Sequence, residues 1–591
     1  MARENYETHE YDVIVIGAGG AGLRAAVEAS AVPGLKVAVI SKSLLGKAHT
    51  VMAEGGVAAS FGNLDHQDSW ETHFYDTMRS GHFINNYRMA EIFAKEAPDR
   101  VLELETWGAV FDRTPEGRIM QRPFGAHTFR RLAHIGDHTG MELLRTMQYK
   151  AIHSGIDVFQ EVTMTKLLMA NGRVAGAFGY FREDGRFVLF RAKAVILATG
   201  GLGRVYKVTS NSWESTGDGA ALAFRAGADL MDMEMVQFHP TGMVWPPGVR
   251  GILVTEGVRG EGGLLYNAEG ERFMQRYDAE RMELSSRDVV ARAIFREAMA
   301  GRGTPHGGAW LDITHKGPDY IKTKLPGMYE QFLTLADLDI TRERFEVAPT
   351  CHYTMGGVRV DPETCATNLP GVFAAGEVAA GLHGANRLGG NSLSDILVFG
   401  RRAGLGARQY LEGMEGGLAA VDEAEIDHEM NRVLAPLTRE KGVNPYHVHE
   451  QLQEIMTTYA GIMRSGETLQ TGLEKLLALK EEAQTMAING SRRYNPGWHA
   501  VFDVQNMLLL SEGIIRSALE RKESRGAHWR TDYPDELPDW QQFNFVESFD
   551  GDAIHIRKEP VPEMPEHLAR LFTYGKAPGL VQTAPGKESS K

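Results

Sequence analysis

The sequence VIVIGAGGAG at residues 13–22 decides the fold of this chain. Its apolar run ends at Gly17, and Gly19, Gly20 and Gly22 lead into an alanine-rich segment, a pattern that predicts a strand, a tight turn and a helix. In such a unit the glycines let the backbone approach a pyrophosphate, and the first N–H groups of the helix face its negative charge. The stretch therefore predicts a bound dinucleotide.

The second apolar strand, at residues 35–40, bears on which dinucleotide binds. A site for NAD usually has an acidic residue at the end of this strand, about 20 residues after the glycines, where it holds a ribose hydroxyl. Ser41 and Lys42 stand there instead. NAD is therefore disfavoured, and FAD held by several separated segments stays open.

Size and composition limit the class of protein. A chain of 591 residues is too long for one core, and about 150 residues per domain suggest three or four domains. Its 43% hydrophobic and 24% charged residues favour a soluble globular protein, and we find neither an apolar run that would cross a bilayer nor an export leader. The net charge of −14 argues against a nucleic-acid partner, which needs basic patches.

The two cysteines, Cys351 and Cys365, exclude a disulfide scaffold and favour a reducing compartment. They also exclude an iron–sulfur cluster in this chain, because such a cluster generally needs four protein ligands. We therefore expect no metal site. If electrons leave the protein one at a time, a second chain must carry the metal.

Further apolar segments indicate the domain organisation. Residues 194–201 and 372–377 are predicted as buried parallel strands beside the nucleotide, residues 156–190 as a small antiparallel sheet, and residues 65–108 as helical. Because the two parallel strands lie far apart in sequence, we expect one sheet built from both sides of an insertion at residues 235–351.

From about residue 423 the apolar residues fall at helical spacing, which predicts a helical bundle. The two stripes consist of Val448, Leu452, Ile455, Tyr459 and Ile462, and of Leu469, Leu473 and Leu476. Beyond Pro534 we expect an irregular chain, with the last dozen residues disordered.

Three polar residues stand where they would meet a cofactor. His49 lies in GKAHTVMAEGG after the dinucleotide unit, Glu377 ends a buried strand, and Ser392 precedes a helical segment at residues 393–411. The carboxylate would hold a ribose or ribityl hydroxyl, and a helix starting at Ser392 would direct its positive end at a flavin ring. A surface histidine, a solvated carboxylate and an ordinary helix cap are the alternatives.

Several motifs, taken together and in this order, resemble those of one family. They are GAGGAG, HTVMAEGG, STGDG (residues 215–219), QFHPTG (237–242), TEGVRGEGG (255–263), SRDVVARA (286–293), HYTMGG (352–357), HGANRLGGNSLSD (383–395) and ESRGAHWRTDYP (523–534). From about residue 11 to about residue 534 the chain resembles the flavoprotein subunit of succinate dehydrogenase and fumarate reductase. The resemblance is specific because several motifs are long.

This resemblance implies an α/β fold. A Rossmann-like FAD-binding domain carries an inserted α+β capping domain and is followed by a helical bundle domain and an irregular C-terminal region. The predicted limits are residues 1–238 and 353–423 for the two parts of the FAD-binding domain, 239–352 for the capping domain, 424–540 for the helical domain and 541–591 for the C-terminal extension.

The resemblance also implies FAD bonded covalently to His49, which raises the flavin potential for the oxidation of a C–C bond. The other implied FAD-binding residues are Gly17, Gly19, Gly20, Gly22, Ser41, Lys42, Thr50, Glu54, Gly55, Gly56, Asp218, Glu377, Ser392 and Leu393. Since Ser41 and Lys42 also fit this family, the missing acid counts against NAD and not against FAD.

The implied substrate is a four-carbon dicarboxylate, held by residues that match His239, Thr255, His352 and Arg387. A guanidinium fork recognises one carboxylate bidentately, while the imidazoles and the hydroxyl donate to the other.

For proton transfer the family uses an arginine, which matches Arg287. It is linked to a carboxylate and a second arginine, which match Glu256 and Arg259. A plain ion pair is the alternative interpretation for these last two residues.

The implied activity is that of an FAD-dependent succinate dehydrogenase of the tricarboxylic acid cycle and respiratory complex II. It implies an iron–sulfur partner subunit and a membrane anchor with quinone, and hence a peripheral place on the cytoplasmic face of the inner (plasma) membrane. Fumarate reductase, which uses the same residues in reverse, is the alternative. L-aspartate oxidase lacks the covalent histidine, and a non-catalytic flavin-binding scaffold would not need the full set of site residues.

Overall fold

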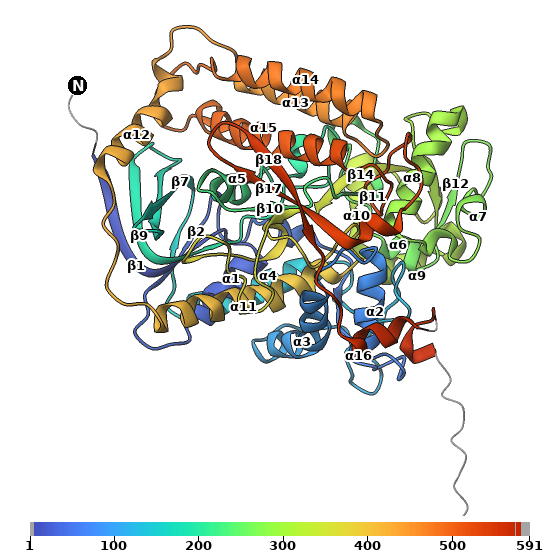
Figure 1. Ribbon diagram of the computed structural model, residues 1–591. Coiled ribbons are helices and arrows are strands. Elements are labelled where there is room, and N and C mark those ends of the chain that lie inside the picture. Colours follow the sequence, from blue (N-terminus) through green and yellow to red (C-terminus); the bar gives the residue numbers. More distant parts are fainter. Residues whose placement is uncertain (1–4, 574, 581–591) are drawn as a thin grey trace, which may run out of the picture.

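The computed structural model describes residues 5–573 and 575–580. Its largest sheet, called the central sheet below, has seven strands and lies at the left in Figure 1. The strand order is β6 (Asp157–Phe159), β2 (Val37–Ile40), β1 (Tyr6–Ile16), β9 (Phe187–Leu197), β8 (Arg173–Phe181) and β7 (Val162–Ala170), and β16 (Val372–Ala374) also pairs with β9. Strands β6, β2, β1, β9 and β16 pair in parallel, whereas β7 and β8 pair in antiparallel fashion.

Strand β9 joins the parallel and the antiparallel part of this sheet. It pairs in parallel with β1 along nearly its whole length, and its last residues also pair in parallel with β16, as predicted for residues 194–201 and 372–377. Its first residues pair with β8, which in turn pairs with β7. The antiparallel strands predicted at residues 156–190 therefore extend the central sheet instead of forming a separate one.

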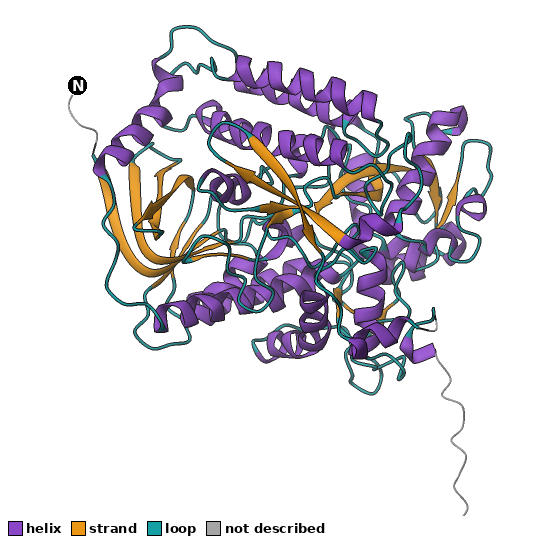
Figure 2. Ribbon diagram, viewed as in Figure 1, coloured by secondary structure: helices purple, strands orange, loops and turns teal. Residues whose placement is uncertain are grey.

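Helices cover the parallel part of the sheet (Figure 2). Helix α1 (Gly20–Ala29) follows β1 directly, and α11 (Asn391–Glu412) and α4 (Thr139–His153) pack against it. The segment predicted as helical at residues 65–108 is two helices, α2 (Trp70–Ser80) and α3 (Tyr87–Thr106). The break occurs where His82 and Phe83 adopt positive φ angles of 52° and 59°, which a helix does not allow.

The inserted part, at the right in Figure 1, has a sheet and an apolar core of its own. Its antiparallel strand order is β11 (Val236–Met243), β14 (Phe345–Thr354), β13 (Ala309–Asp312) and β12 (Leu264–Tyr266). Around it lie α6 (Gly257–Gly260), α7 (Met274–Tyr277), α8 (Arg287–Glu297), α9 (Pro318–Lys324) and α10 (Pro326–Ala336). The predicted domain limits themselves stay predictions.

The predicted helical bundle consists of α12 (Glu423–Thr438), α13 (Pro445–Tyr459), α14 (Gly466–Ala483) and α15 (Pro496–Glu520). Both apolar stripes pack inward, except that Tyr459 is half-buried and Ile462 lies beyond the end of α13. Helix α15 also packs against α5 (Asp218–Arg225) of the FAD-binding part.

The prediction of an irregular chain beyond Pro534 is wrong for residues 543–560. Here β17 (Phe543–Phe549) and β18 (Ile554–Pro560) form a hairpin, which joins β10 (Leu230–Met231) and β15 (Gly357–Val358) in one sheet. The alternating apolar residues and the Asp550–Gly551 turn were the local signals for it. Residues 581–591, which hold nearly all of the stretch predicted to be disordered, lie outside the described residues.

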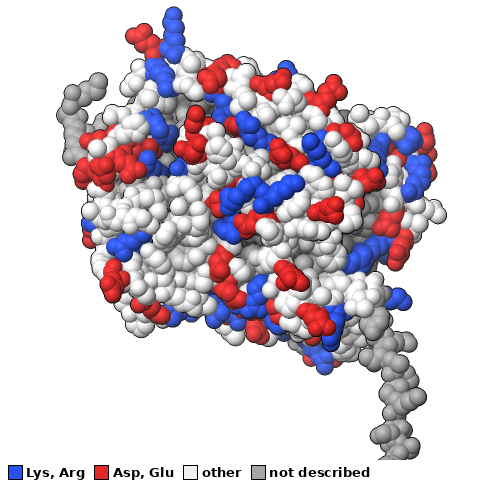
Figure 3. All heavy atoms as spheres, viewed as in Figure 1, with Lys and Arg blue, Asp and Glu red and all other residues white. Residues whose placement is uncertain are grey.

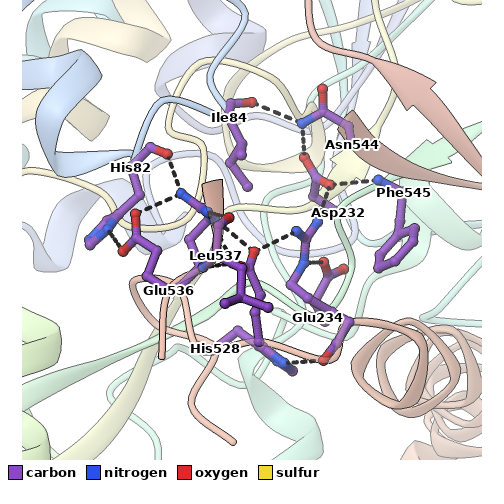
Figure 4. A network of polar contacts seen from close by, with 12 residues as sticks. His82, Ile84, Asp232, Glu234, His528, Glu536, Leu537, Asn544 and Phe545 are labelled. Carbon is purple, nitrogen blue, oxygen red and sulfur yellow. Dashed lines mark hydrogen bonds and ion pairs between the residues drawn. The ribbon is translucent and has the colours of Figure 1, made fainter. Parts of the chain in front are cut away.

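A network of polar contacts, buried at Asn544 and exposed at Glu536, attaches this C-terminal region to the rest of the fold (Figure 4). Asn544 Nδ2 donates to Asp232 Oδ2 at 2.6 Å and to the Ile84 carbonyl at 2.8 Å. His82 Nδ1 lies 2.7 Å from Glu536 Oε2. The C-terminal region therefore connects the loop between α2 and α3 with Asp232, the residue that follows β10.

On the face shown in Figure 3, Lys and Arg side chains are interspersed with Asp and Glu side chains. The negative net charge is therefore not gathered in one patch on this face. Within residues 5–573 and 575–580, no helix has both the length and the apolar character needed to cross a membrane.

Candidate active site

A cavity of about 1400 Å³, its open mouth included, lies where the parallel strands of the central sheet end. It is lined by the turn between β1 and α1, the end of β2, the short helix η1 (His49–Met52), the start of α5 and the first turn of α11. Ligands of α/β folds bind at the carboxyl ends of parallel strands. This cavity is therefore the candidate cofactor site.

The glycine turn shapes the inner end of this cavity. Gly17 has a φ of +116°, and a Cβ there would lie 2.2 Å from the Ala198 carbonyl oxygen, so only glycine fits. Gly19 caps α1 without any side-chain hydrogen bond of its own, and the first amide of the helix, that of Gly20, donates to Thr50 Oγ1 at 3.1 Å beside the cavity. The turn therefore fits the pyrophosphate of FAD.

Most residues predicted to bind the cofactor line this cavity. These are Gly17, Gly19, Gly20, Ser41, Lys42, His49, Thr50, Asp218, Glu377, Ser392 and Leu393. Gly22 does not; it packs against the Gly17 carbonyl. Glu54, Gly55 and Gly56 stand behind η1, where Arg122 donates to the carbonyls of Glu54 and Gly55 at 3.0 and 2.7 Å.

Helix α11 begins at Asn391 with Gly390 as its N-cap, so Ser392 lies in the first turn and is not the cap.

His49 begins η1 at the cavity wall. The Ser212 amide donates to His49 Nδ1 at 3.2 Å, so Nε2 is the ring nitrogen left to form another bond. Burial, together with the cationic Arg387, lowers the pKa of His49 to about 4. The imidazole is therefore neutral at pH 7.

Two arginines meet on one amide oxygen at the other end of the cavity. Gln237 Oε1 accepts from Arg287 Nη1 at 3.2 Å and from Arg387 Nη2 at 3.3 Å. Arg387 also donates to Ser392 Oγ at 2.9 Å and lies 4.3 Å above the Tyr353 ring, while its Nε has no hydrogen-bond partner among the described residues. Burial, together with Arg287, lowers the pKa of Arg387 to about 9.

His239 and His352 face each other from β11 and β14, with ring centroids 5.0 Å apart. Ser210 Oγ holds His352 Nδ1 at 2.7 Å, and the Thr241 carbonyl lies 3.0 Å from His239 Nδ1. Burial, and then the neighbouring arginines, lower both pKa values well below the ordinary range, with His239 adding to the effect on His352. Both rings are therefore neutral donors or acceptors. Thr255, also buried, lies just before α6.

The three residues predicted for proton transfer lie side by side in the interior. Glu256 Oε2 is 2.8 Å from Arg287 Nε and 3.7 Å from Arg259 Nη2, and its Oε1 accepts from the Gly125 amide at 2.6 Å. Burial would raise the pKa of Glu256, but the two arginines outweigh it and the pKa is lowered. Glu256 is therefore an ionised carboxylate between two guanidinium groups.

Sequence reasoning missed several supporting residues. Gln237 is in the quoted QFHPTG motif on β11, close to His239, and that position was the available signal. Tyr353 adjoins His352 in the same way. The stretch at residues 124–138, which the sequence analysis did not single out, supplies the Gly125 amide that donates to Glu256.

No cluster of at least three His, Cys, Asp or Glu side chains suited to a metal ion occurs in the part of the chain that the structure describes. Both cysteines are buried free thiols, without a disulfide bond. The polar groups brought together beside the cofactor cavity are arginines, histidines and one carboxylate.

The chain matches two family profiles. One is described as an FAD binding domain and covers residues 12–393, and the other, the C-terminal part of the fumarate reductase flavoprotein, covers residues 449–568. A fumarate reductase (CoM/CoB) subunit of Methanothermobacter marburgensis is 47% identical over 537 residues, which are 91% of this chain and 97% of the relative. The succinate dehydrogenase flavoprotein subunit of Rickettsia bellii is 38% identical over 575 residues, which are 94% of this chain and 95% of that one.

A solved structure agrees with these relatives. Sdh1 of Mycobacterium smegmatis, in complex with UQ1, superposes with a TM-score of 0.85 at 53% sequence identity, and the match covers 95% of each chain. The predicted fold class is confirmed. The chain belongs to the family of succinate dehydrogenase and fumarate reductase flavoprotein subunits, and it is an FAD-dependent oxidoreductase.

Proposed function

We propose that this protein is the catalytic flavoprotein subunit of a succinate dehydrogenase, which oxidises succinate to fumarate. The observation that carries the proposal is the pair of guanidinium groups, Arg287 and Arg387, joined by the Gln237 amide at the end of the cofactor cavity. Two cations beside two neutral imidazoles suit a molecule with two carboxylates. FAD, when bound, supplies the hydride acceptor.

Arg387 is the proposed anchor for one carboxylate. Its guanidinium is held by Gln237, by Ser392 and by the face of Tyr353, so little side-chain freedom is lost when a dicarboxylate binds. His239, His352 and Thr255 supply the donors for the second carboxylate. Such fixed groups orient the reacting C–H bonds.

Arg287 is the proposed proton acceptor. Arginine hardly deprotonates in water, so it acts here only through a transient loss of a proton. Arg287 Nε first gives its proton to Glu256 Oε2, 2.8 Å away, and the neutral guanidine then takes the proton that the substrate releases. Glu256 passes its proton to Arg259, 3.7 Å away, as Arg259 gives up one of its own.

Fumarate reduction is the second candidate. The relative from M. marburgensis belongs to a fumarate reductase, and the same residues would act in reverse. The test is to purify the intact complex and compare succinate oxidation with fumarate reduction, using the quinone that co-purifies. Faster fumarate reduction would reverse the proposed direction, and turnover of neither acid would refute the proposal.

We propose that the FAD is bonded to His49. The Ser212 amide occupies Nδ1 and directs Nε2 to the bond, and the lowered pKa keeps the ring neutral and nucleophilic. Denatured protein should then keep flavin fluorescence on a gel, whereas the His49→Ser variant should lose it. Release of all flavin from the parent by acid precipitation would contradict the covalent bond.

We also propose that electrons pass to an iron–sulfur subunit on a membrane anchor with quinone, at the cytoplasmic face of the membrane. Helix α4 supports this: Met141, Tyr149 and Ile152 on its outer face are 50–51% exposed, although they are apolar. The helix also adjoins η1, since the Gly140 amide donates to the Ala53 carbonyl at 2.6 Å.

A substitution on this face tests the partner proposal. Ile152→Glu should lower quinone reduction by the complex and leave succinate turnover with an artificial acceptor unchanged. The control is Met299→Glu, at a 73% exposed apolar residue of the inserted part. Equal quinone reduction by both variants would place the partner elsewhere.

A further inference from the structure

Two carboxylates from distant segments meet at the end of β2, where the sequence lacks the acidic residue of an NAD site. Lys42 Nζ lies 2.7 Å from Asp218 Oδ2 and 3.2 Å from Asp503 Oδ1. Asp218 is the first residue of α5, in the FAD-binding part, whereas Asp503 lies on α15 of the helical bundle. Lys42 and Asp218 line the cofactor cavity, and Asp503 stands behind them.

The same face of α15 makes two more contacts with α5, one at each end of that helix. Asn506 Nδ2 donates to Asp218 Oδ1 at 3.1 Å, and its Oδ1 accepts from Arg225 Nη1 at 2.6 Å. One turn further, Leu510 fills the space beside Gly217, where an added Cβ would lie 2.4 Å from Leu510 Cδ1. Residues three and four apart share one face of a helix. The bundle is therefore fitted to this end of the cofactor site.

The charges explain why Lys42 needs both carboxylates. Burial alone would lower the pKa of Lys42, but Asp218 and Asp503 outweigh it and the pKa is raised. Burial raises the pKa of Asp503, against the attraction of Lys42. Lys42 also donates to Thr216 Oγ1 at 2.7 Å, and Thr216 Oγ1 lies 2.8 Å from Asp218 Oδ1. The ammonium group thus links α15 to the residues that face the cavity.

We propose that Asp503 is a positioning residue of the FAD site, which acts through Lys42 to hold Asp218 where the adenosine ribose binds. The end of β2 is where dinucleotide folds bind that ribose. Docking of α15 and binding of the adenosine end of FAD are therefore coupled. This inference rests on the proposed function in one respect, the use of FAD as the cofactor.

The test measures cofactor affinity in the His49→Ser background, where FAD dissociates. Adding Asp503→Asn should weaken the binding of FAD about tenfold, the loss expected for one charge-assisted contact. ADP, the adenosine half of FAD, should lose affinity by the same factor. Asp503→Glu keeps the charge and should restore part of the affinity. Unchanged FAD and ADP affinities would overturn the proposal.

A control on the same helix separates positioning from stability. Glu512→Gln is the same kind of change, but Glu512 pairs with Lys480 and Arg516 inside the bundle. It should lower the melting temperature with and without FAD and leave FAD affinity unchanged. For Asp503→Asn the rise in melting temperature on adding FAD should shrink. If both variants lose stability alike and keep that rise, Asp503 is only structural.

Failure of the cofactor proposal would look different from failure of the coupling. If the His49→Ser parent binds neither FAD nor ADP, the use of FAD is refuted whatever the Asp503 variants do. If the parent binds FAD and the Asp503 variants bind it equally well, only the coupling is refuted.

Discussion

The two ends of the cavity are built by different means. The cofactor end rests on a backbone turn: the glycines are continuous in sequence, and a Cβ at Gly17 would meet another main-chain atom at 2.2 Å, with the side chains of Lys42 and Asp218 beside that turn. The proposed substrate end consists of side chains, which are brought together from β11, α6, α8, β14 and the segment before α11. A substitution that blocks the backbone turn should therefore abolish cofactor binding altogether. Substitutions among the side chains of the substrate end should change substrate binding and turnover separately.

The largest effect is expected at Gly17. Gly17→Ala places a Cβ against the Ala198 carbonyl at a φ of +116°, so the turn cannot form and FAD should not bind at all. Flavin absorbance of the purified protein is the measurement. Gly34→Ala is the control, because Gly34 has a φ of +92° but nothing within 4 Å of an added Cβ. It should keep its flavin; a flavin-loaded Gly17→Ala variant would refute the backbone account.

The next largest effect should separate turnover from binding. Arg287→Gln should lower kcat by about 10²–10⁴, the range for loss of an acid–base group, and change malonate affinity much less. Arg292→Gln on the same helix, where Arg292 pairs with Asp288 at 2.7 Å, is the matched control. Near-normal turnover would remove Arg287 from the mechanism, and loss of FAD would make it structural.

Arg387→Lys should affect binding first. Loss of one charge-assisted contact costs roughly 1.5–3 kcal/mol, so malonate affinity should fall at least about tenfold. The loss should be larger at pH 8 than at pH 6.5: these surroundings lower the pKa of arginine to about 9, and lysine starts from an ordinary value of about 10.4. An unchanged inhibition constant would place the carboxylate elsewhere.

The last effect, on stability and not on turnover, concerns two buried glutamates, one at each end of the cavity. Burial raises the pKa of Glu377 from 4.5 to about 7, whereas the arginines lower that of Glu256. The folded protein thus holds the Glu377 proton more tightly, and this stability is full below pH 4.5 and is lost as pH rises to 7. In FAD-free protein the free energy of unfolding should fall by up to about 1.4 kcal/mol per pH unit in this window.

Glu377→Gln should flatten that slope in the FAD-free His49→Ser protein, as measured by urea unfolding at pH 5, 6 and 7. The contribution of Glu256 has the opposite sign, since it is present above pH 4.5 and lost only in acid. An equal slope with and without Glu377 would assign the pH dependence to another group.

Much of the fold could be predicted from local patterns. The parallel strands and the glycine turn were correct, because buried β-branched runs and glycines constrain the backbone over a few residues. The join between the antiparallel strands and the central sheet was not predicted, because one continuous strand, β9, takes part in both. The hairpin at residues 543–560 was overlooked although its turn signal was present.

The candidate site, like the fold, could be predicted from the sequence only in part. Motif residues identified the chemical groups, but Gln237 gained its role only because Arg287 and Arg387 reach it from other elements. No pattern near Lys42 indicated Asp503, which is 461 residues away.

The sequence by itself determined the glycine turn, the buried strands and the helical stripes, because each depends on sterics and hydrogen bonds within a few residues. Its motifs, through their resemblance to one family, supplied the candidate reactive groups. Only the tertiary structure decided which charges meet. Glu256 and Arg287, 31 residues apart, come within 2.8 Å because the insertion folds around its own core. Asp503 reaches Lys42 because α15 packs on α5. Such pairings depend on how whole elements bury their apolar faces, which no short stretch of sequence specifies.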